Sequence, residues 1–234
     1  MRWTMPDRKP RVGFELLCEL VFRPAAHLVA RALLPLRVSP PVVVLAGTAT
    51  GIAAAVEVGR GAYLAAALLL QLKTVLDNAD GQLARMSGRV TSFGRYLDSE
   101  SDLLVDAAVF AALGLRFGAL PALAGFVLLT TVLSLNFNVE RLYRGSPAGE
   151  PDGSLLARVY AVVYGPQDRL AEALVRRPSA RTVGVAANFG LSTQLAVLGL
   201  CLALGHPGAY VVVLIVCAAV LAALLTTDRG RIQP

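Results

Sequence analysis

Charged residues are scarce in this sequence, and so are cysteine, histidine and tryptophan. Only 16% of its 234 residues are charged, whereas 56% are hydrophobic. Soluble domains of this length carry more charge than this, and the apolar residues here form long runs that are typical of transmembrane helices. The composition therefore argues against an ordinary soluble enzyme and indicates a membrane protein.

The three cysteines and two histidines stand singly, so the chain offers no thiol or imidazole metal site. None of Cys18, Cys201, Cys217, His27 and His206 has a partner at the spacing of zinc ligands. We interpret all five as packing residues. The net charge of +6 comes without the alternation of aromatic and basic residues that single-stranded nucleic acid requires, so no nucleic-acid partner is expected.

Apolar segments predict an all-α, polytopic membrane fold with six transmembrane helices. Several segments are shorter than the roughly 20 residues that cross a bilayer. We therefore expect the second and third to continue as helix through their polar ends. The segments cover residues 40–58, 62–76, 97–115, 120–135, 189–204 and 209–226.

The stretch before the first span mixes charged and apolar residues. Residues 12–34 predict an amphipathic helix that lies on the membrane surface and ends at Pro35. The alternative is a helix packed against the bundle. We accordingly divide the chain into an interfacial segment, 1–38, and a six-helix transmembrane domain, 39–234.

The segment LDNADGQLARMSGRVTSFGRYLDSESD, residues 76–102, places four aspartates at the ends of two apolar spans. Asp77 and Asp80 lie about 60° apart on one helix, and Asp98 and Asp102 lie one turn apart on the next. A short linker brings the two helices together, so the carboxylates are expected to converge. Such a cluster needs cations. Oxygen ligands favour Mg²⁺ or Mn²⁺, and a pair of these ions suits displacement at phosphorus.

Arginine positions predict the orientation of the protein. They gather before the first span, between the second and third, between the fourth and fifth, and in the tail. The intervening connections carry only Arg60, Arg116 and His206 as basic residues. By the positive-inside rule, both termini and the aspartate cluster are expected on the cytoplasmic side of the cell membrane.

The full spacing, D-x-x-D-G-x-x-A-R-x(8)-G-x-x-x-D-x-x-x-D, resembles the signature of the CDP-alcohol phosphotransferase family without a mismatch. The six-span layout with an N-terminal surface helix is also similar to that family. Eight fixed positions within 26 residues make the motif specific. They are filled by Asp77, Asp80, Gly81, Ala84, Arg85, Gly94, Asp98 and Asp102.

This resemblance implies an enzyme of phospholipid biosynthesis. Members of the family transfer a phosphoalcohol group, commonly phosphatidyl, from a CDP-alcohol to a second alcohol and release CMP. By motif position, Asp77, Asp80 and Asp98 hold two Mg²⁺ ions, for which Mn²⁺ can substitute. Asp102 is then the general base and also touches one ion. The contacts to the cytidine diphosphate come from Gly81, Ala84, Arg85, Thr91 and Gly94.

The same resemblance implies partners. They are a lipid donor, CDP-diacylglycerol by preference, a small polar acceptor alcohol, and a second copy of the chain in a homodimer. Arg141, Arg144 and Arg181 suit a phosphate on the acceptor, or they simply follow the positive-inside bias. The family often has T-P-N-x-x-T before the first span, whereas Pro41 and Val44 replace the asparagine and the second threonine here. The resemblance therefore does not extend to a side-chain contact with the nucleotide from that loop.

Several alternatives remain open. The donor can instead resemble CDP-choline or CDP-ethanolamine, with diacylglycerol as the acceptor. A membrane prenyltransferase needs two separate aspartate motifs, whereas this sequence has one compact cluster. An ion-coupled transporter predicts mid-membrane acids and repeated halves, and the sequence shows neither. Lys73 either pairs with the aspartates as part of the site or is merely neutralised between helices. Asn136 and Asn138 either line the acceptor pocket or are ordinary helix-end residues.

Overall fold

The computed structural model describes residues 13–145, 158, 165–174 and 178–230, and within these ranges the chain is helical with no strand. The predicted all-α class is therefore confirmed. The elements are η1 (Cys18–Phe22), α1 (Arg23–Leu33), α2 (Pro40–Arg60), α3 (Tyr63–Met86), α4 (Ser92–Phe117), α5 (Ala119–Tyr143), α7 (Gly165–Leu174), α8 (Ala180–Ala186), η2 (Ala187–Phe189), α9 (Leu191–Ala203) and α10 (Ala209–Gly230).

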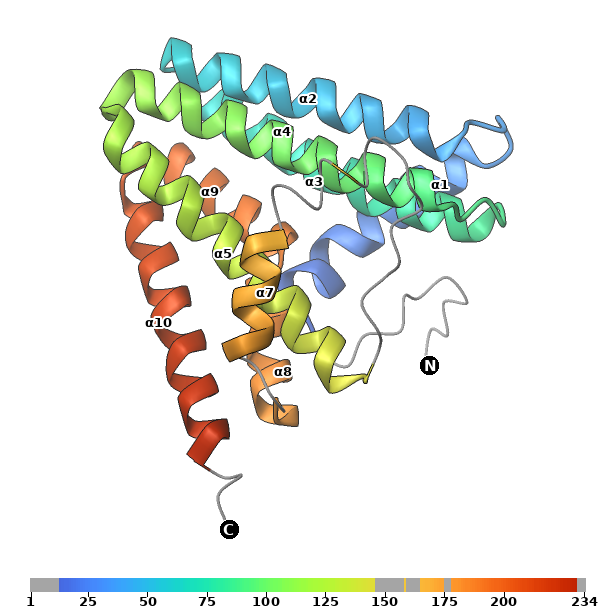
Figure 1. The fold of residues 1–234 in the computed structure, drawn as a ribbon. Helices are drawn as coiled ribbons and strands as arrows, with labels where there is room; N and C mark the ends of the chain where they lie inside the picture. Colours follow the sequence, from blue (N-terminus) through green and yellow to red (C-terminus); the bar gives the residue numbers. More distant parts are fainter. Residues whose placement is uncertain (1–12, 146–157, 159–164, 175–177, 231–234) are drawn as a thin grey trace.

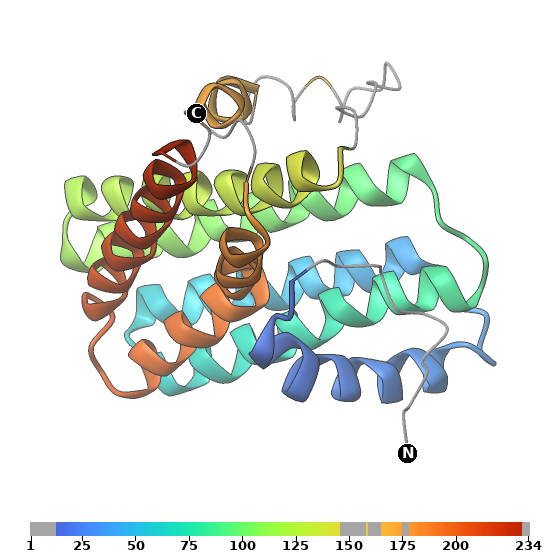
Figure 2. The same cartoon turned by 90° about the horizontal axis from the view of Figure 1, so that it is seen from below.

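The bundle is organised around α2, which packs against both α3 and α4 (Figure 1). Helix α4 continues the packing to α5, and α5 to α10, while α9 and α1 lie against α3. Figure 2 shows α1 and α7 on opposite sides of the bundle. The shared core contains Leu70 of α3, Val105 of α4, Leu129 of α5 and Leu198 of α9, all at most 1% exposed.

Each of the six predicted apolar segments forms a helix. The expected extension of the second and third is confirmed, because α3 runs to Met86 and α4 begins at Ser92. By length and apolarity, α2, α5 and α10 are able to cross a membrane, and the bent pair 180–189 and 191–203 makes a possible fourth span. These helices agree with a membrane protein, whereas the number of six spans stays a prediction.

The N-terminal helix is packed against the bundle on one face. Ala30 is fully buried in a cluster with Val43 and Leu83, and the Gln82 amide donates a 3.2 Å hydrogen bond to the carbonyl oxygen of Arg23. Leu28 on the same helix is 69% exposed. Helix α1 is therefore amphipathic and anchored on α3, and its contact with the membrane surface remains a prediction.

A glycine permits the close approach of α2 and α4. A Cβ atom on Gly51 would lie 2.5 and 2.6 Å from the two methyl groups of Val105, which is fully buried. Atoms cannot approach that closely, so a side chain at position 51 forces the helices apart. Small residues at such crossings are typical of membrane bundles.

Gly51→Ala is therefore expected to lower the free energy of unfolding by about 1–3 kcal/mol. Thermal unfolding in detergent measures this, as a fall of about 2–4 °C per kcal/mol for a chain of this size. Because the clash is with Val105, Gly51→Ala/Val105→Ala should be more stable than the sum of the two single changes predicts. Strict additivity would show that the clash is relieved elsewhere.

Two carboxylates hold α7 and α10 to neighbouring helices, and of these Asp168 is partly buried and Asp228 is buried. Asp168 of α7 accepts hydrogen bonds from the Ser134 hydroxyl at 2.8 Å and the Asn138 amide at 2.7 Å, both on α5. Asp228 of α10 accepts from the Thr182 hydroxyl at 2.6 Å.

Candidate active site

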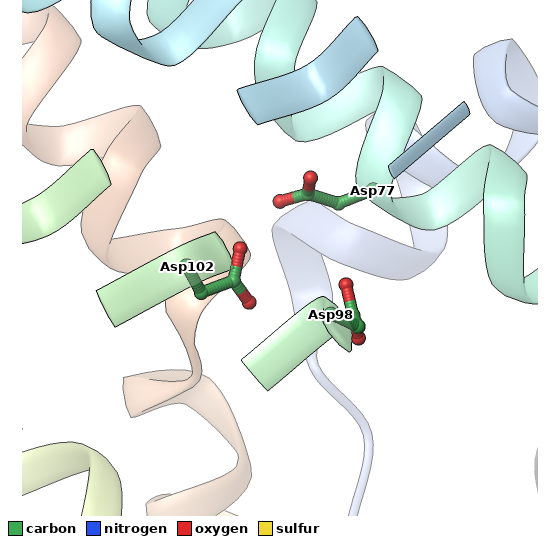
Figure 3. Close-up of side chains that lie close together, drawn as sticks. All are labelled: Asp77, Asp98 and Asp102. Atoms are coloured by element: carbon green, nitrogen blue, oxygen red, sulfur yellow. The ribbon is translucent and has the colours of Figure 1, made fainter. Parts of the chain in front are cut away.

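Three of the four motif aspartates meet between α3 and α4. Asp77 comes from α3, and Asp98 and Asp102 come from successive turns of α4. One carboxylate oxygen from each lies within 4.8 Å of the others. Figure 3 shows the three side chains directed toward a common space. Within the described residues, the structure thus brings together carboxylates that are separated by up to 25 positions in the chain, as the helical spacing predicts.

The fourth aspartate lies deeper. Asp80 is only 6% exposed, and its Oδ2 atom has no hydrogen-bond donor within the described part of the chain. Its electrostatic partners include Asp98, Asp77 and Asp102. A buried carboxylate oxygen without a donor is costly. A bound cation would supply the positive partner that this oxygen lacks among the described residues.

Lys73 is part of this cluster. Its ammonium group donates to Oδ2 of Asp77 and to Oδ1 of Asp102, so it links α3 to α4. The Lys73 side chain is 2% exposed, whereas those of Asp77 and Asp102 are 17% and 21% exposed. The lysine is therefore more deeply buried than the two carboxylates that it contacts.

The donor set fits a hard divalent cation. All candidate ligands are carboxylate oxygens, and those of Asp77, Asp98 and Asp102 converge on one space. The buried Oδ2 of Asp80 has no hydrogen-bond partner among the residues that the structure describes. Mg²⁺ and Mn²⁺ prefer such ligands. Asp77, Asp80, Asp98 and Asp102 would hold the metal.

The residues expected at the nucleotide surround the ends of the same two helices. The Thr91 hydroxyl accepts a 3.0 Å hydrogen bond from the Gly94 backbone amide and caps the N-terminus of α4. A Cβ atom on Gly94 would lie 3.2 Å from that hydroxyl oxygen, and one on Gly81 would lie 3.3 Å from the Arg85 guanidinium. Both glycines thus leave room for a neighbouring polar group. Ala84 is half-buried on the last turn of α3.

Two neighbours of the site were missed in the sequence. A Cβ atom on Gly47 of α2 would lie 3.1 Å from Asp77 Oδ1, so this glycine makes room beside a site carboxylate. Asp106 is 5% exposed, one turn deeper than Asp102 on α4, and interacts electrostatically with Lys73 and Asp102. The four-residue spacing from Asp102 was the available signal for Asp106. Nothing in the sequence marked Gly47.

The other polar residues that the sequence suggested for substrate binding lie in different environments. Asn138 is fully buried and holds α7, and its carbonyl oxygen accepts a 2.8 Å hydrogen bond from Arg141. Arg144 pairs with Glu140 one turn earlier on the same helix. Arg181 is exposed on α8, and Asn136 is partly buried. Ser39 precedes α2 and Pro41 lies in its first turn, where it offers no side-chain hydrogen bond.

Comparison with known proteins adds independent information. The family model for CDP-alcohol phosphatidyltransferases matches residues 32–232. A phosphatidylinositol phosphate synthase of Streptomyces avermitilis is 38% identical over 94 residues, which are 40% of this chain and 36% of that protein. A bifunctional IPC transferase and DIPP synthase of Aquifex aeolicus is 46% identical over 58 residues, 24% of this chain and 14% of that protein.

A solved structure is also similar. The phosphatidylinositol phosphate synthase of Mycobacterium tuberculosis, crystallised with CDP-DAG bound, is 23% identical with a TM-score of 0.43, covering 81% of this chain and 93% of that one. The curated relatives named above are each matched over little more than a third of their length or less. The family model, by contrast, spans most of the chain and includes every motif aspartate, so the chain belongs to the CDP-alcohol phosphatidyltransferase family.

Proposed function

We propose that this protein is a membrane-bound, divalent-metal-dependent transferase that moves a phosphatidyl group from CDP-diacylglycerol to a phosphorylated polar alcohol and releases CMP. The observation that carries the proposal is the convergence of Asp77, Asp98 and Asp102 within 4.8 Å, together with Asp80, whose Oδ2 has no hydrogen-bond donor in the described ranges. Family membership supports the reaction class. We propose a phosphorylated acceptor because the chain resembles phosphatidylinositol phosphate synthases.

Different residues of the site bind the donor and accept the proton in the proposed reaction. Arg85, at the end of α3, suits the diphosphate of the donor because its guanidinium offers paired donors. The acceptor hydroxyl gives its proton to Asp102, whose Oδ2 is left free by Lys73. The hydroxyl oxygen then bonds to the lipid-bearing phosphorus, the bond from that phosphorus to the bridging oxygen breaks, and CMP leaves. Bound Mg²⁺ or Mn²⁺ supplies neutralisation of the diphosphate charge during this displacement.

The site lies where the two substrates can meet. Asp77, Asp98 and Asp102 stand near the polar ends of α3 and α4, a few turns from the apolar core around Leu70. A lipid donor can therefore keep its tails among apolar helices while a polar acceptor enters from water. We place this side of the bundle in the cytoplasm, with both termini, because the arginines concentrate there. We also expect a homodimer with two Mg²⁺ ions in each site.

The test is CMP release from CDP-diacylglycerol by the purified protein with Mg²⁺ or Mn²⁺. The acceptors are glycerol 3-phosphate, inositol, inositol phosphate, serine and choline. We expect inositol phosphate to support turnover and free inositol to fail, since Arg141, Arg144 and Arg181 offer positive charge near the end of α5 and on α8. A chelator should abolish the reaction.

Turnover with free inositol or serine, and none with inositol phosphate, would refute the phosphorylated acceptor. Silence with every acceptor, in folded protein that binds Mn²⁺, would refute CDP-diacylglycerol as the donor. The assay would then be repeated with CDP-choline and diacylglycerol.

A further inference from the structure

Lys73 is the most unusual charged residue of the described chain. It lies on α3 and is only 1% exposed, in a bundle whose core is mostly apolar. A buried ammonium group is tolerated only where carboxylates neutralise it. Its hydrogen-bond acceptors are Asp77 and Asp102, and Asp106 also interacts with its charge.

Two of these carboxylates are also candidate metal ligands. Asp77 and Asp102 each present an oxygen to the group that converges within 4.8 Å. Lys73 already takes one oxygen from each. A divalent cation held by the remaining oxygens of these carboxylates would therefore lie close to a fixed positive charge. Charges of like sign at that separation repel strongly in a medium of low dielectric constant.

From this geometry we infer that Lys73 is a resident cation of the site, which competes with divalent metal for the same carboxylates. It holds the acidic ends of α3 and α4 together before metal binds, and it raises the metal concentration needed to fill the site. The inference rests on the metal site of the proposed function. Because coupling between two ligands is reciprocal, a cation that stabilises the metal-free site must weaken metal binding to it.

A purely structural ion pair would behave differently. It would stabilise the protein by the same amount at every metal concentration, and its removal would leave metal affinity unchanged. A lysine that orients the ligands would act in the opposite direction, since loss of such an outer partner typically weakens metal binding about 10–100-fold. The direction of the change in affinity therefore separates the three roles.

The experiment uses the full chain in detergent and the variant Lys73→Met. Thermal unfolding is followed first in EDTA and then over a Mn²⁺ titration, and Mn²⁺ binding is measured by electron paramagnetic resonance. We expect the variant to melt about 4–10 °C below wild type in EDTA. We expect it to bind Mn²⁺ about tenfold more tightly or better, so that the melting difference shrinks as Mn²⁺ saturates.

Gln71→Leu is the matched control. Gln71 lies half a turn before Lys73 on α3 and donates a 3.2 Å hydrogen bond to the carbonyl oxygen of Leu195, away from the carboxylates. This variant should melt lower by a constant amount and keep the wild-type Mn²⁺ affinity. If Lys73→Met does not fold, Lys73→Gln keeps a polar group without the charge and carries the same expectation for Mn²⁺.

Unchanged or weaker Mn²⁺ binding in the folded Lys73 variant would overturn the inference while leaving the proposed function intact. Wild-type protein that binds no Mn²⁺ would overturn both, because the metal site itself would be absent. Since the readouts are binding and melting, neither outcome depends on finding the correct acceptor alcohol.

Discussion

Asp98→Asn is expected to reduce CMP release by about 10³-fold or more while the protein still inserts and folds. Asp98 is one of three carboxylates whose oxygens meet within 4.8 Å, and it is partly exposed. Asparagine keeps the volume and one oxygen but loses the charge that attracts a divalent cation. Charge stabilisation by a metal in such a reaction contributes several kcal/mol, and each 1.36 kcal/mol corresponds to about a tenfold change in rate.

CMP release and Mn²⁺ binding should therefore fall together in this variant. Glu100→Gln is the matched control, because Glu100 lies two residues further along α4, on another face of the helix, and is not one of the converging carboxylates. The control should retain both properties. Near-normal CMP release by Asp98→Asn would refute the assignment of Asp98 as a metal ligand.

Asp80→Asn is expected to have opposite effects on activity and on stability. Transfer should fall about 10²-fold or more, since a metal ligand is lost. In EDTA, however, the variant should unfold at a higher temperature than wild type. Asp80 is 6% exposed, near three other aspartates, and its Oδ2 has no donor among the described residues. Asparagine removes the cost of burying a carboxyl group among other acids, which should add about 1–3 kcal/mol to the free energy of unfolding.

Melting curves with and without Mn²⁺ measure this exchange of stability for function. Mn²⁺ should raise the melting temperature of wild type more than that of Asp80→Asn. The difference between the two melting temperatures should therefore shrink or change sign as the metal saturates. Asp98→Asn is the comparison, because Asp98 is more exposed and its removal should stabilise the chelated protein less. A lower melting temperature of Asp80→Asn in EDTA would show that a partner holds the Asp80 carboxylate.

Much of the fold was predictable, because helix position depends on local patterns. The apolar run starting at Pro40 predicted α2, and the four-residue spacing of Asp98 and Asp102 predicted a shared face of α4. The need for about 20 residues to cross a bilayer predicted that α3 continues past Leu76. Local spacing and helical geometry were enough in each case.

The remainder depended on contacts between distant segments. Lys73 was expected to meet an acid, but its bond to Asp102, 29 positions away, follows from how α3 faces α4. Gly47 matters only because α2 approaches Asp77 at that point. Packing of Ala30 against Leu83 decides that α1 is anchored on the bundle. Such pairings require relative helix positions, which the periodicity of a single helix does not contain.

The ion pair between α3 and α4 also bears on how the chain enters the bilayer. Neither helix is apolar enough to be a candidate membrane span by itself. Charged residues near the apolar core lower the apolarity of both helices. They are Lys73, Asp77, Asp102 and Asp106. Presented to lipid one at a time, these charges oppose insertion, whereas across the hairpin Lys73 offsets part of the negative charge of Asp77 and Asp102. We therefore expect α3 to enter the membrane only after α4 has been synthesised. The two helices would then insert together as a hairpin.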